Sequence, residues 1–324
     1  MSTSTDEPNT GEPTADETTA GGAGNPDAAP GVTVTPAVLR EWPLPSPGAS
    51  KYERGQVVIV GGDRRSPGAA LLAAEASLRV GAGRLTLALA EGAAIAAAVA
   101  LPESGVVALR ETDDQQIDGS AIDAAADDLG DADAVLAGPG LDDAEQALTL
   151  VDRLPALVGD ETVVVLDAYA LGVLPRSTVG DAFAGRLVLT PNLGEVERLL
   201  DAAGSADTGL GDDPDDAALD AAARSVARAY GAVVSCQGRV AHPDGRLWLI
   251  GSGHGGLGTS GSGDVLAGAI AGLCARGASP EQAAVWATHA HAAAGDRLAV
   301  AVGPLGFLAH ELLAELPRVL VEVG

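Results

Sequence analysis

Aromatic side chains and lysines are scarce in this chain of 324 residues. Phe, Trp and Tyr together make up 2% of it, and Lys51 is the only lysine. Long apolar stretches are also missing, because Gly, Pro or charged residues interrupt each candidate for a membrane span. The first residues contain neither a basic segment nor an apolar core, which excludes a signal peptide. These absences predict a protein without a membrane partner.

Cysteine and positive charge are limited as well. Cys236 and Cys274 lie in unrelated contexts without metal-site spacing, which predicts buried free thiols in a reducing, cytoplasmic compartment. The 19 Lys and Arg oppose 45 Asp and Glu, and the net charge of −26 disfavours nucleic acid as a partner. A surface rich in Asp and nearly free of Lys is typical of proteins from salt-loving organisms, in which salt screens the repulsion. An acidic partner-binding surface is the alternative interpretation.

The composition divides the chain into two parts. Residues 1–30 contain six carboxylates and no Lys or Arg, a composition typical of a disordered, solvated segment. Pro43, Pro45 and Pro47 then indicate a linker. We therefore predict an acidic disordered tail and linker over residues 1–48 and one folded domain over residues 49–324.

From residue 50 onward, short Val- and Leu-rich runs alternate with segments of helical length. The runs predict strands over residues 57–60, 84–89, 134–137, 163–166, 186–189, 232–235 and 247–250. The segments between and after them predict helices over residues 67–80, 143–153, 194–202, 216–230, 264–276 and 280–297. Continuous apolar strands separated by helices are typical of the α/β class, with a mostly parallel central sheet and helices on both faces.

Turns rich in Gly, Pro and Asn follow four of the predicted strands. They begin at Gly61, Gly138, Asp167 and Thr190. Each turn alone is more typical of a simple strand-to-helix connection. Ligands of open α/β sheets bind beyond the carboxyl ends of the strands, however, so four such turns together indicate a binding crevice.

The most distinctive segment holds five glycines between Gly255 and Gly263, and Asp264 and an apolar helix follow it. Free backbone N–H groups in such a loop, together with a helix N-terminus, attract anions such as nucleotide phosphates. Asp264 would lie beside a bound phosphate, where a carboxylate can take the proton of an attacking hydroxyl. The simpler alternative is that Asp264 only caps the helix.

Other motifs are less informative. A G-x-G-x-x-G pattern over residues 251–256 is not followed directly by a helix, and the chain has no Walker A lysine. Phosphate contacts must therefore come from backbone N–H groups, arginine or a metal. His289 and His291 lie two apart on a predicted helix, and we interpret them as core or surface side chains.

Taken together, these segments resemble the ribokinase-like family of ADP- or ATP-dependent NAD(P)H-hydrate dehydratases, over residues 50–317. The matching stretches are residues 57–62, 67–70, 79–83, 138–141, 166–168, 189–191 with 194–195, 261–268, and 290–291 with 295–296. The resemblance implies a ribokinase-like fold and a lyase that repairs hydrated NADH and NADPH (NADHX and NADPHX). Phosphorylation of the ring hydroxyl, followed by loss of phosphate, would restore the ring double bond.

The resemblance also implies two sets of site residues. The hydrated dinucleotide would lie along Ala70, Gly140 and Asn192, with Asp264 at its hydroxyl as the catalytic residue. The adenine nucleotide, ADP or ATP, would contact Gln237, Gly238, Arg239 and Gly263. Mg²⁺ would bridge its phosphates, and no side chain is predicted as a direct metal ligand.

Several positions depart from the family pattern. Asn192 and Leu193 replace a His-Pro pair, and Tyr169 takes a position that is often acidic. The turn from Gln237 to Arg239 lacks the usual Lys and Thr, although Arg239 is available to supply charge. Two alternatives therefore stay open: a kinase of a small hydroxymethyl compound, and a nucleotide-binding relative without catalysis.

The resemblance and the composition also lead to expectations about the setting. Many relatives fuse an epimerase domain ahead of the dehydratase, and about fifty residues cannot hold one. We therefore expect the epimerase to be a separate chain, and we expect this chain to form a homo-oligomer. The acidic composition predicts an origin in a halophilic archaeon.

Overall fold

The structure of this protein is a computed structural model that describes residue 1 and residues 30–205, 210–211, 214–253 and 255–324. The predicted disorder of residues 2–29 lies outside this range. The described strands are β1 (Val32–Val34), β2 (Gln56–Val60), β3 (Arg84–Ala90), β4 (Gly105–Leu109), β5 (Ala134–Ala137), β6 (Val163–Leu166), β7 (Leu187–Leu189), β8 (Val233–Cys236), β9 (Arg239–Ala241) and β10 (Leu247–Ile250).

These strands form one sheet in the order β1-β10-β9-β8-β7-β6-β5-β2-β3-β4. Neighbouring strands run parallel, except that β9 is antiparallel to both β8 and β10. All seven predicted strands are present within a residue or two of their predicted bounds. The prediction of a mostly parallel sheet is confirmed, and β1, β4 and β9 are additions to it.

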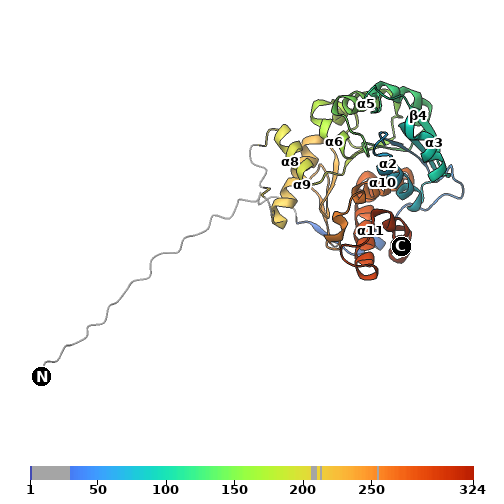
Figure 1. The fold of residues 1–324 in the computed structure, drawn as a ribbon. Coiled ribbons are helices and arrows are strands. Elements are labelled where there is room, and N and C mark those ends of the chain that lie inside the picture. Colours follow the sequence, from blue (N-terminus) through green and yellow to red (C-terminus); the bar gives the residue numbers. More distant parts are fainter. Residues whose placement is uncertain (2–29, 206–209, 212–213, 254) are drawn as a thin grey trace.

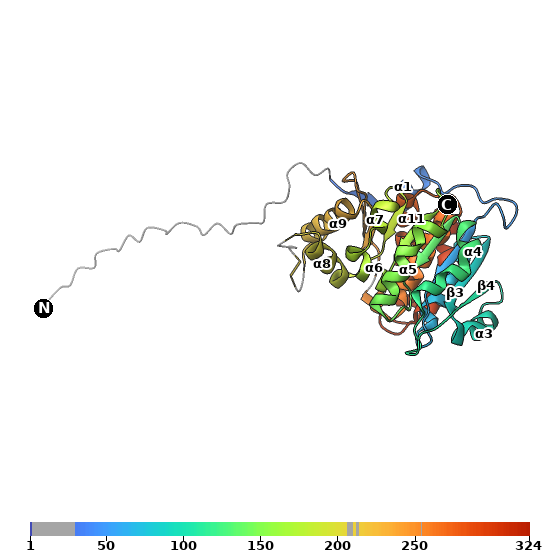
Figure 2. The same ribbon diagram turned by 90° about the horizontal axis from the view of Figure 1, so that it is seen from above.

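Helices precede, connect and follow the strands (Figures 1 and 2). The α-helices are α1 (Pro36–Glu41), α2 (Pro67–Arg79), α3 (Glu91–Ala100), α4 (Ala126–Gly130), α5 (Ala144–Leu157), α6 (Tyr169–Val173), α7 (Val179–Ala182), α8 (Leu193–Ala202), α9 (Asp216–Tyr230), α10 (Ser262–Ala275), α11 (Pro280–Ala301) and α12 (Ala309–Val323). Three short 3₁₀ helices are η1 (Gly119–Ala125), η2 (Leu174–Arg176) and η3 (Gly255–Gly258). All six predicted helices are present.

The sheet is buried on both faces because its side chains alternate between two apolar layers. Val57 and Ile59 of β2 pack into one layer with α2, α10, α11 and α12. Val58 and Val60 pack into the other layer with η1, α5, α6, α8 and α9. Figure 1 shows α5 and α6 on one side of the sheet and α10 and α11 on the other. Each of these buried Val or Ile side chains contributes roughly 1.5–3 kcal/mol.

The prediction of an unstructured linker is wrong for residues 32–41, because β1 and α1 form there. Strand β1 pairs with β10, and the ring of Trp42 stacks on Trp248 with centroids 5.8 Å apart. Trp286 Nε1 and Gln282 Nε2 donate to the carbonyl oxygen of Trp42 at 2.9 and 3.2 Å. The segment is therefore part of the domain, held by contacts that its proline-rich sequence did not reveal.

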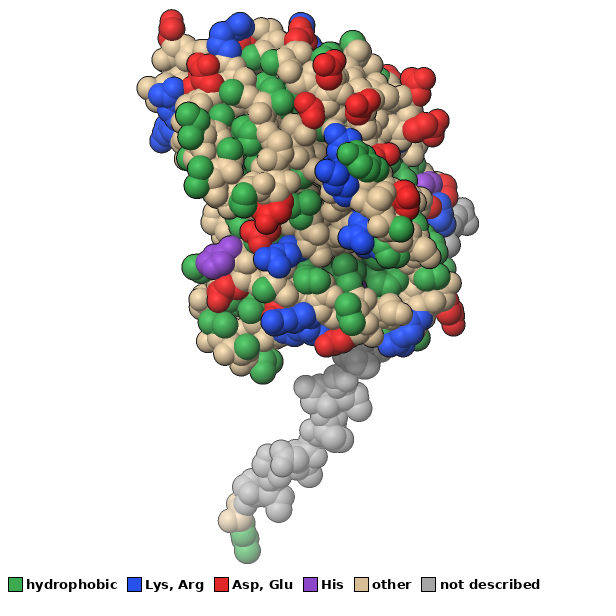
Figure 3. All heavy atoms as spheres, turned by 90° about the vertical axis from the view of Figure 1, so that its right-hand side faces the viewer, with side chains coloured by type: hydrophobic (Ala, Val, Ile, Leu, Met, Phe, Trp, Pro, Cys, Tyr) green, Lys and Arg blue, Asp and Glu red, His purple; other side chains and the backbone are tan. Residues whose placement is uncertain are grey.

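Charge is spread over the surface. On the face drawn in Figure 3, acidic side chains dot the upper part, and Lys and Arg lie mainly in the middle and lower parts. Among the helices that the structure describes, none is both long and apolar enough to cross a bilayer.

Candidate active site

The strand order reverses direction between β2 and β5. From β2 the chain adds β3 and β4 on one side, and β5 then lies on the other side of β2. The loops after these two strands meet, because Gly62 N donates to Pro139 O at 2.8 Å and Asp63 N donates to Gly140 O at 2.9 Å. Such a switch point opens a crevice at the carboxyl ends of the strands, and ligands of α/β sheets bind there.

Two glycines allow this crevice to form. Gly140 has φ +72°, and a Cβ there would lie 2.4 Å from Ser66 O in the loop before α2. Gly138 has φ +125°, and a Cβ there would lie 1.8 Å from Asp167 O at the end of β6. Only glycine permits both the positive φ and the close approach. Gly140, a predicted substrate residue, therefore lies at the switch point.

Asp264 stands beside the same crevice on the first turn of α10. A Cβ at Gly268 or Gly272 would lie 2.1 or 2.6 Å from the carbonyl oxygens of Ala73 or Ser77, so α2 and α10 pack closely and in parallel. The two helix N-termini therefore lie side by side, and α10 also contacts β2, β5 and β6. The N-cap of α10 is Gly261 with φ +90°, so the alternative that Asp264 is the helix cap is wrong.

The environment of Asp264 suits a base. Its side chain is partly buried, and no described residue donates a hydrogen bond to it or forms an ion pair with it. Burial raises the pKa of this carboxyl to about 6. Gly263, the predicted phosphate contact, is exposed on the same turn. The free N–H groups of this turn add the partial positive charge of a helix N-terminus.

A second carboxylate, Asp167, ends β6 beneath the crevice and is 7% exposed. Its Oδ1 accepts a hydrogen bond from Thr190 Oγ1 at the end of β7, at 2.8 Å. Burial, assisted by the negative charges of Asp264 and Glu195, raises the pKa of Asp167 to about 7. The sequence pattern indicates Asp167 only as part of a turn, because its environment depends on strands that are far apart in the sequence.

Asn192 is the N-cap of α8, in a capping box with Glu195. Asn192 Oδ1 accepts from Glu195 N at 3.0 Å, and Glu195 Oε2 accepts from Asn192 N at 2.8 Å. The side-chain oxygen of Asn192 is thus engaged, and its amide N–H₂ is the group available to a ligand. Burial raises the pKa of Glu195.

Ala70 is enclosed below the loop that follows β2. The residue is fully buried in α2, and its methyl group packs beneath Gly62. The close packing of α2 under the β2 loop encloses this side chain, and the placement of Ala70 along the substrate stays a prediction.

Three of the four predicted nucleotide residues line a cavity of about 810 Å³. Gln237 and Gly238, with φ +46° and +71°, form the tight turn between β8 and β9 and line the cavity with Arg239. The glycine loop before α10 and the inner side of α11 complete the lining, through Gly255, Thr288 and His291 among others. Gly263 is not part of this lining and lies farther along the same glycine segment.

Arg239 does not supply free charge to the cavity. It forms ion pairs with Asp216 and with Asp220 of α9, the second through Nε at 3.1 Å. Its Nη1 also donates to Gln237 O at 2.9 Å. The idea that Arg239 replaces the missing lysine is therefore corrected: two carboxylates already neutralise its charge, and it braces the β8–β9 turn against α9.

His291 contacts the glycine segment, which its interpretation as an ordinary core or surface side chain did not predict. Its Nε2 lies 2.9 Å from Ser262 Oγ and 3.0 Å from Ser262 O, across 29 positions of the chain. Burial lowers the pKa of His291 to about 4, so the ring is neutral. His291 thus fixes the start of α10, and its spacing from Ser262 carries no sequence signal.

Comparisons with known proteins agree with this geometry. A family of carbohydrate-kinase type, described as NAD(P)H-hydrate dehydratase, matches residues 57–318. The chain is 44% identical over 297 residues to the ADP-dependent (S)-NAD(P)H-hydrate dehydratase of Xanthomonas campestris pv. campestris, covering 89% of this chain and 96% of that protein. It spans about half the length of the bifunctional NAD(P)H-hydrate repair enzymes that it also matches.

Solved structures match the fold. A ribokinase-like superfamily protein from Enterococcus faecalis V583 superposes with a TM-score of 0.72 at 22% identity, over 90% of this chain and 96% of that one. The ADP/ATP-dependent NAD(P)H-hydrate dehydratase from Bacillus subtilis, co-crystallised with ATP/Mg²⁺, does so with a TM-score of 0.70 at 27% identity, over 92% and 100%. The chain therefore has the ribokinase-like fold and belongs to the family of NAD(P)H-hydrate dehydratases.

Proposed function

We propose that this chain is an ADP- or ATP-dependent (S)-NAD(P)H-hydrate dehydratase, a lyase that restores NADH and NADPH from their hydrated forms. The observation that supports this most directly is Asp264, an unpaired and partly buried carboxylate beside the crevice between β2 and β5. The family match and the 44% identity to an enzyme of this name support the same activity.

We place the two substrates in adjacent spaces. The hydrated nicotinamide would lie in the crevice, against the backbone of Gly140, the amide of Asn192 and the carboxylate of Asp264. The adenine nucleotide would occupy the cavity beside the turn formed by Gln237 and Gly238. Its phosphates would then point along the glycine segment toward Gly263. Ala70 is not included as a side-chain contact, because it is fully buried.

This arrangement supports phosphoryl transfer to the ring hydroxyl. Asp264 takes the hydroxyl proton as the oxygen attacks the terminal phosphorus of the nucleotide. Backbone N–H groups at the start of α10 stabilise the charge on the transferring phosphoryl group. The contact between His291 and Ser262 keeps these N–H groups in place. Loss of phosphate from the product restores the ring double bond.

The crevice fits Mg²⁺ brought in with the nucleotide. In the described part of the chain, no three His, Cys, Asp or Glu side chains form a metal cluster of their own. Protein-bound Mg²⁺ usually takes one or two carboxylates together with phosphates and water. Glu195 would hold it, since only one of its carboxylate oxygens is engaged in the capping box. When bound, Mg²⁺ neutralises negative charge on the phosphates.

The test is restoration of NADH from NADHX. The protein is incubated with NADHX, Mg²⁺ and either ADP or ATP in high salt, while absorbance of NADH is followed. We expect NADH to return only when a nucleotide is present, and the faster nucleotide identifies the preferred donor. A stable phosphorylated product would instead indicate a small-molecule kinase. Binding of ADP without turnover of any hydroxyl substrate would indicate a non-catalytic relative.

Several finer points are part of the proposal. The excess of acidic residues supports adaptation to high salt, and with it an origin in a halophilic archaeon. A cytoplasmic location, a homo-oligomeric state, a separate epimerase chain and a disordered acidic tail stay predictions. Size-exclusion chromatography with light scattering in high salt would report the oligomeric state.

A further inference from the structure

Reversal of hydration needs two proton acceptors. Hydration adds a hydroxyl to one ring carbon and a hydrogen to its neighbour, so repair must remove both. Asp264 accounts for the hydroxyl proton in the proposed function, on which this inference rests. The hydrogen on the neighbouring carbon leaves only after the phosphate has begun to depart, and by then Asp264 already carries a proton.

The crevice offers a second carboxylate next to the first. Asp167 ends β6, and α10, which carries Asp264, packs on β5 and β6. The loop of Gly138 passes directly over the backbone of Asp167, so this residue lies under the switch-point loop. Thr190 Oγ1 donates to Asp167 Oδ1 at 2.8 Å and fixes the orientation of the carboxylate.

Asp167 has no cationic partner among the residues that the structure describes. No Lys or Arg of the described chain pairs with it, and its nearest charged neighbours are Asp264 and Glu195. A structural carboxylate buried this deeply is normally paired with a cation. Ala168, the next residue, has φ +49°, an unusual conformation for a residue that is not glycine. Unpaired charge and backbone strain together are typical of functional positions.

We propose that Asp167 is a second catalytic residue, which accepts the proton from the ring carbon next to the phosphorylated carbon. In the first step, the hydroxyl oxygen bonds to phosphorus, the bond from phosphorus to the nucleotide breaks, and Asp264 takes the hydroxyl proton. In the second step, the C–O bond breaks and phosphate leaves with the electron pair, while the ring nitrogen donates its lone pair to the carbon. The Asp167 carboxylate then takes the adjacent proton, the C–H electrons form the carbon–carbon double bond, and the electrons of the C=N bond return to the ring nitrogen.

The two steps support each other electrostatically. When Asp264 takes up its proton, its negative charge disappears, and repulsion of an ionised Asp167 disappears with it. Asp167 is therefore most easily ionised after phosphoryl transfer, when the second proton must be removed. Its raised pKa also places it near the pH at which a general base is most effective.

The inference predicts that Asp167→Asn separates phosphate release from NADH formation. Without a proton acceptor, the ring cation is recaptured by water, which regenerates NADHX after phosphate has left. Both products are measured in one reaction of the full-length variant with NADHX, ADP and Mg²⁺. The wild type should release one phosphate per NADH. In the variant, NADH formation should fall by about 10²-fold or more, while phosphate release should change much less.

A substrate isotope experiment tests the same step in the variant. NADHX prepared by hydrating NADH in D₂O carries deuterium on the carbon next to the hydroxyl-bearing carbon. In Asp167→Asn, where proton removal limits the rate, this substrate should slow NADH formation further and leave phosphate release unchanged. Equal rates with both isotopes in that variant would contradict the role.

Two further variants keep the test interpretable. Thr190→Val retains the carboxylate but removes its hydrogen-bond donor, and it should raise phosphate released per NADH in the same direction by a smaller factor. Asp123→Asn, which breaks the exposed ion pair of η1 with Arg153, should keep the ratio at one. If both products fall equally in a folded Asp167→Asn protein, or if neither falls, the inference is overturned. If the wild type itself forms neither product, the proposed function fails instead.

Discussion

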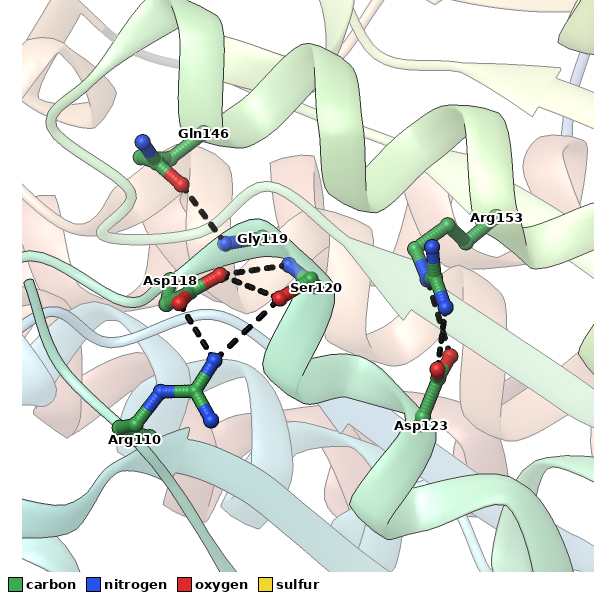
Figure 4. Close-up of polar contacts among 7 residues, drawn as sticks. All are labelled: Arg110, Asp118, Gly119, Ser120, Asp123, Gln146 and Arg153. Carbon is green, nitrogen blue, oxygen red and sulfur yellow. Dashed lines mark hydrogen bonds and ion pairs between the residues drawn. The ribbon is translucent and has the colours of Figure 1, made fainter.

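Aspartates at the crevice and around η1 are the same residue type in opposite environments. Figure 4 shows the η1 network, where Arg110 Nη2 donates to Asp118 Oδ2 at 2.6 Å and Arg153 pairs with Asp123. The hydrogen bond from Arg110, followed by that from Ser120, lowers the pKa of Asp118 to about 2. At the crevice, by contrast, burial without a cation raises the pKa of Asp264 to about 6 and that of Asp167 to about 7.

The difference separates carboxylates that are paired with arginine from those that we propose to be functional. Around η1, Asp118 and Asp123 are each paired with an arginine. Hydrogen bonds also hold the β4–α5 connection together; for example, Gln146 Oε1 accepts from Gly119 N at 2.9 Å. In a chain with 45 acidic and 19 basic residues, cations are limited, and among the described residues none forms an ion pair with Asp264 or Asp167. Those carboxylates are destabilising when ionised, which is tolerated where proton transfer requires it.

The largest effect expected is on catalysis by Asp264. Asp264→Asn removes the proton acceptor and should lower kcat for NADH regeneration by about 10²–10⁴-fold. The matched control, Asp123→Asn, breaks the exposed pair with Arg153 and should keep kcat within about twofold. Initial rates with NADHX and ADP, together with melting curves for both variants, make the comparison. Equal losses in both variants would remove the distinction between the two regions.

The pH dependence of kcat/KM should reflect the raised pKa of Asp264 rather than the pKa of an exposed carboxyl group. Asp264 must be ionised to act, and its pKa is raised to about 6 by burial, so kcat/KM should fall about tenfold per pH unit below that value. Asp167 and Glu195 are the neighbouring titratable groups, and their pKa values are raised too. The profile is measured from two units below to two units above pH 6. An acidic limb near pH 4 would contradict the assignment.

Substitution of Asp167 should increase stability although it decreases activity. Its pKa is about 7 in the folded state against about 3.9 when unfolded, so the protonated form favours folding, and that contribution is lost as pH rises through 7. Asp167→Asn should therefore raise the free energy of unfolding above pH 7, on the order of 1–3 kcal/mol. Below about pH 4 the two proteins should match. Urea unfolding at both pH values measures this, and destabilisation at high pH would contradict it.

The smallest effect is expected at η1, where loss of a carboxylate should decrease stability rather than increase it. Arg110 lowers the pKa of Asp118 to about 2. The ionised Asp118 therefore contributes to stability above the pKa that it has in the unfolded chain, and this contribution is lost as the pH falls through 2. Asp118→Asn keeps a capping side chain and loses only the charge, so unfolding should become easier by about 0.5–1 kcal/mol at neutral pH. The loss should vanish in strong acid. A stabilised Asp118→Asn protein would show that its ion pair costs more than it contributes.

Elements with strong local patterns were predicted well. The apolar runs of β2, β5 and β6 and the capped start of α11, where Ser279 Oγ accepts from Gln282 N, follow directly from residue type. Strand β1 was missed because three residues are too few to give a strand pattern, even though Val and Thr favour strands, and the segment is held in place by pairing with β10. Helix α3 was missed because its Ala-rich segment has no cap signal.

The site residues divide in a similar way. Gly140 and Asp264 lie where the sequence predicted, because glycine-rich turns and helix starts are local features. The burial of Ala70 under a loop and the pairing of Arg239 with α9 could not be predicted, because both depend on distant segments. The roles of Asp167 and His291 depend on partners on other strands and helices, for which no spacing rule exists.

The sequence by itself determined the α/β class, the turns at the strand ends and the position of the acid after the glycine segment, since period, glycine content and helix caps act over a few residues. The tertiary structure alone decided which carboxylates have cations beside them and which do not. Burial and Coulomb interactions act between segments that only the sheet order brings together, and they set the proton affinity of each carboxylate.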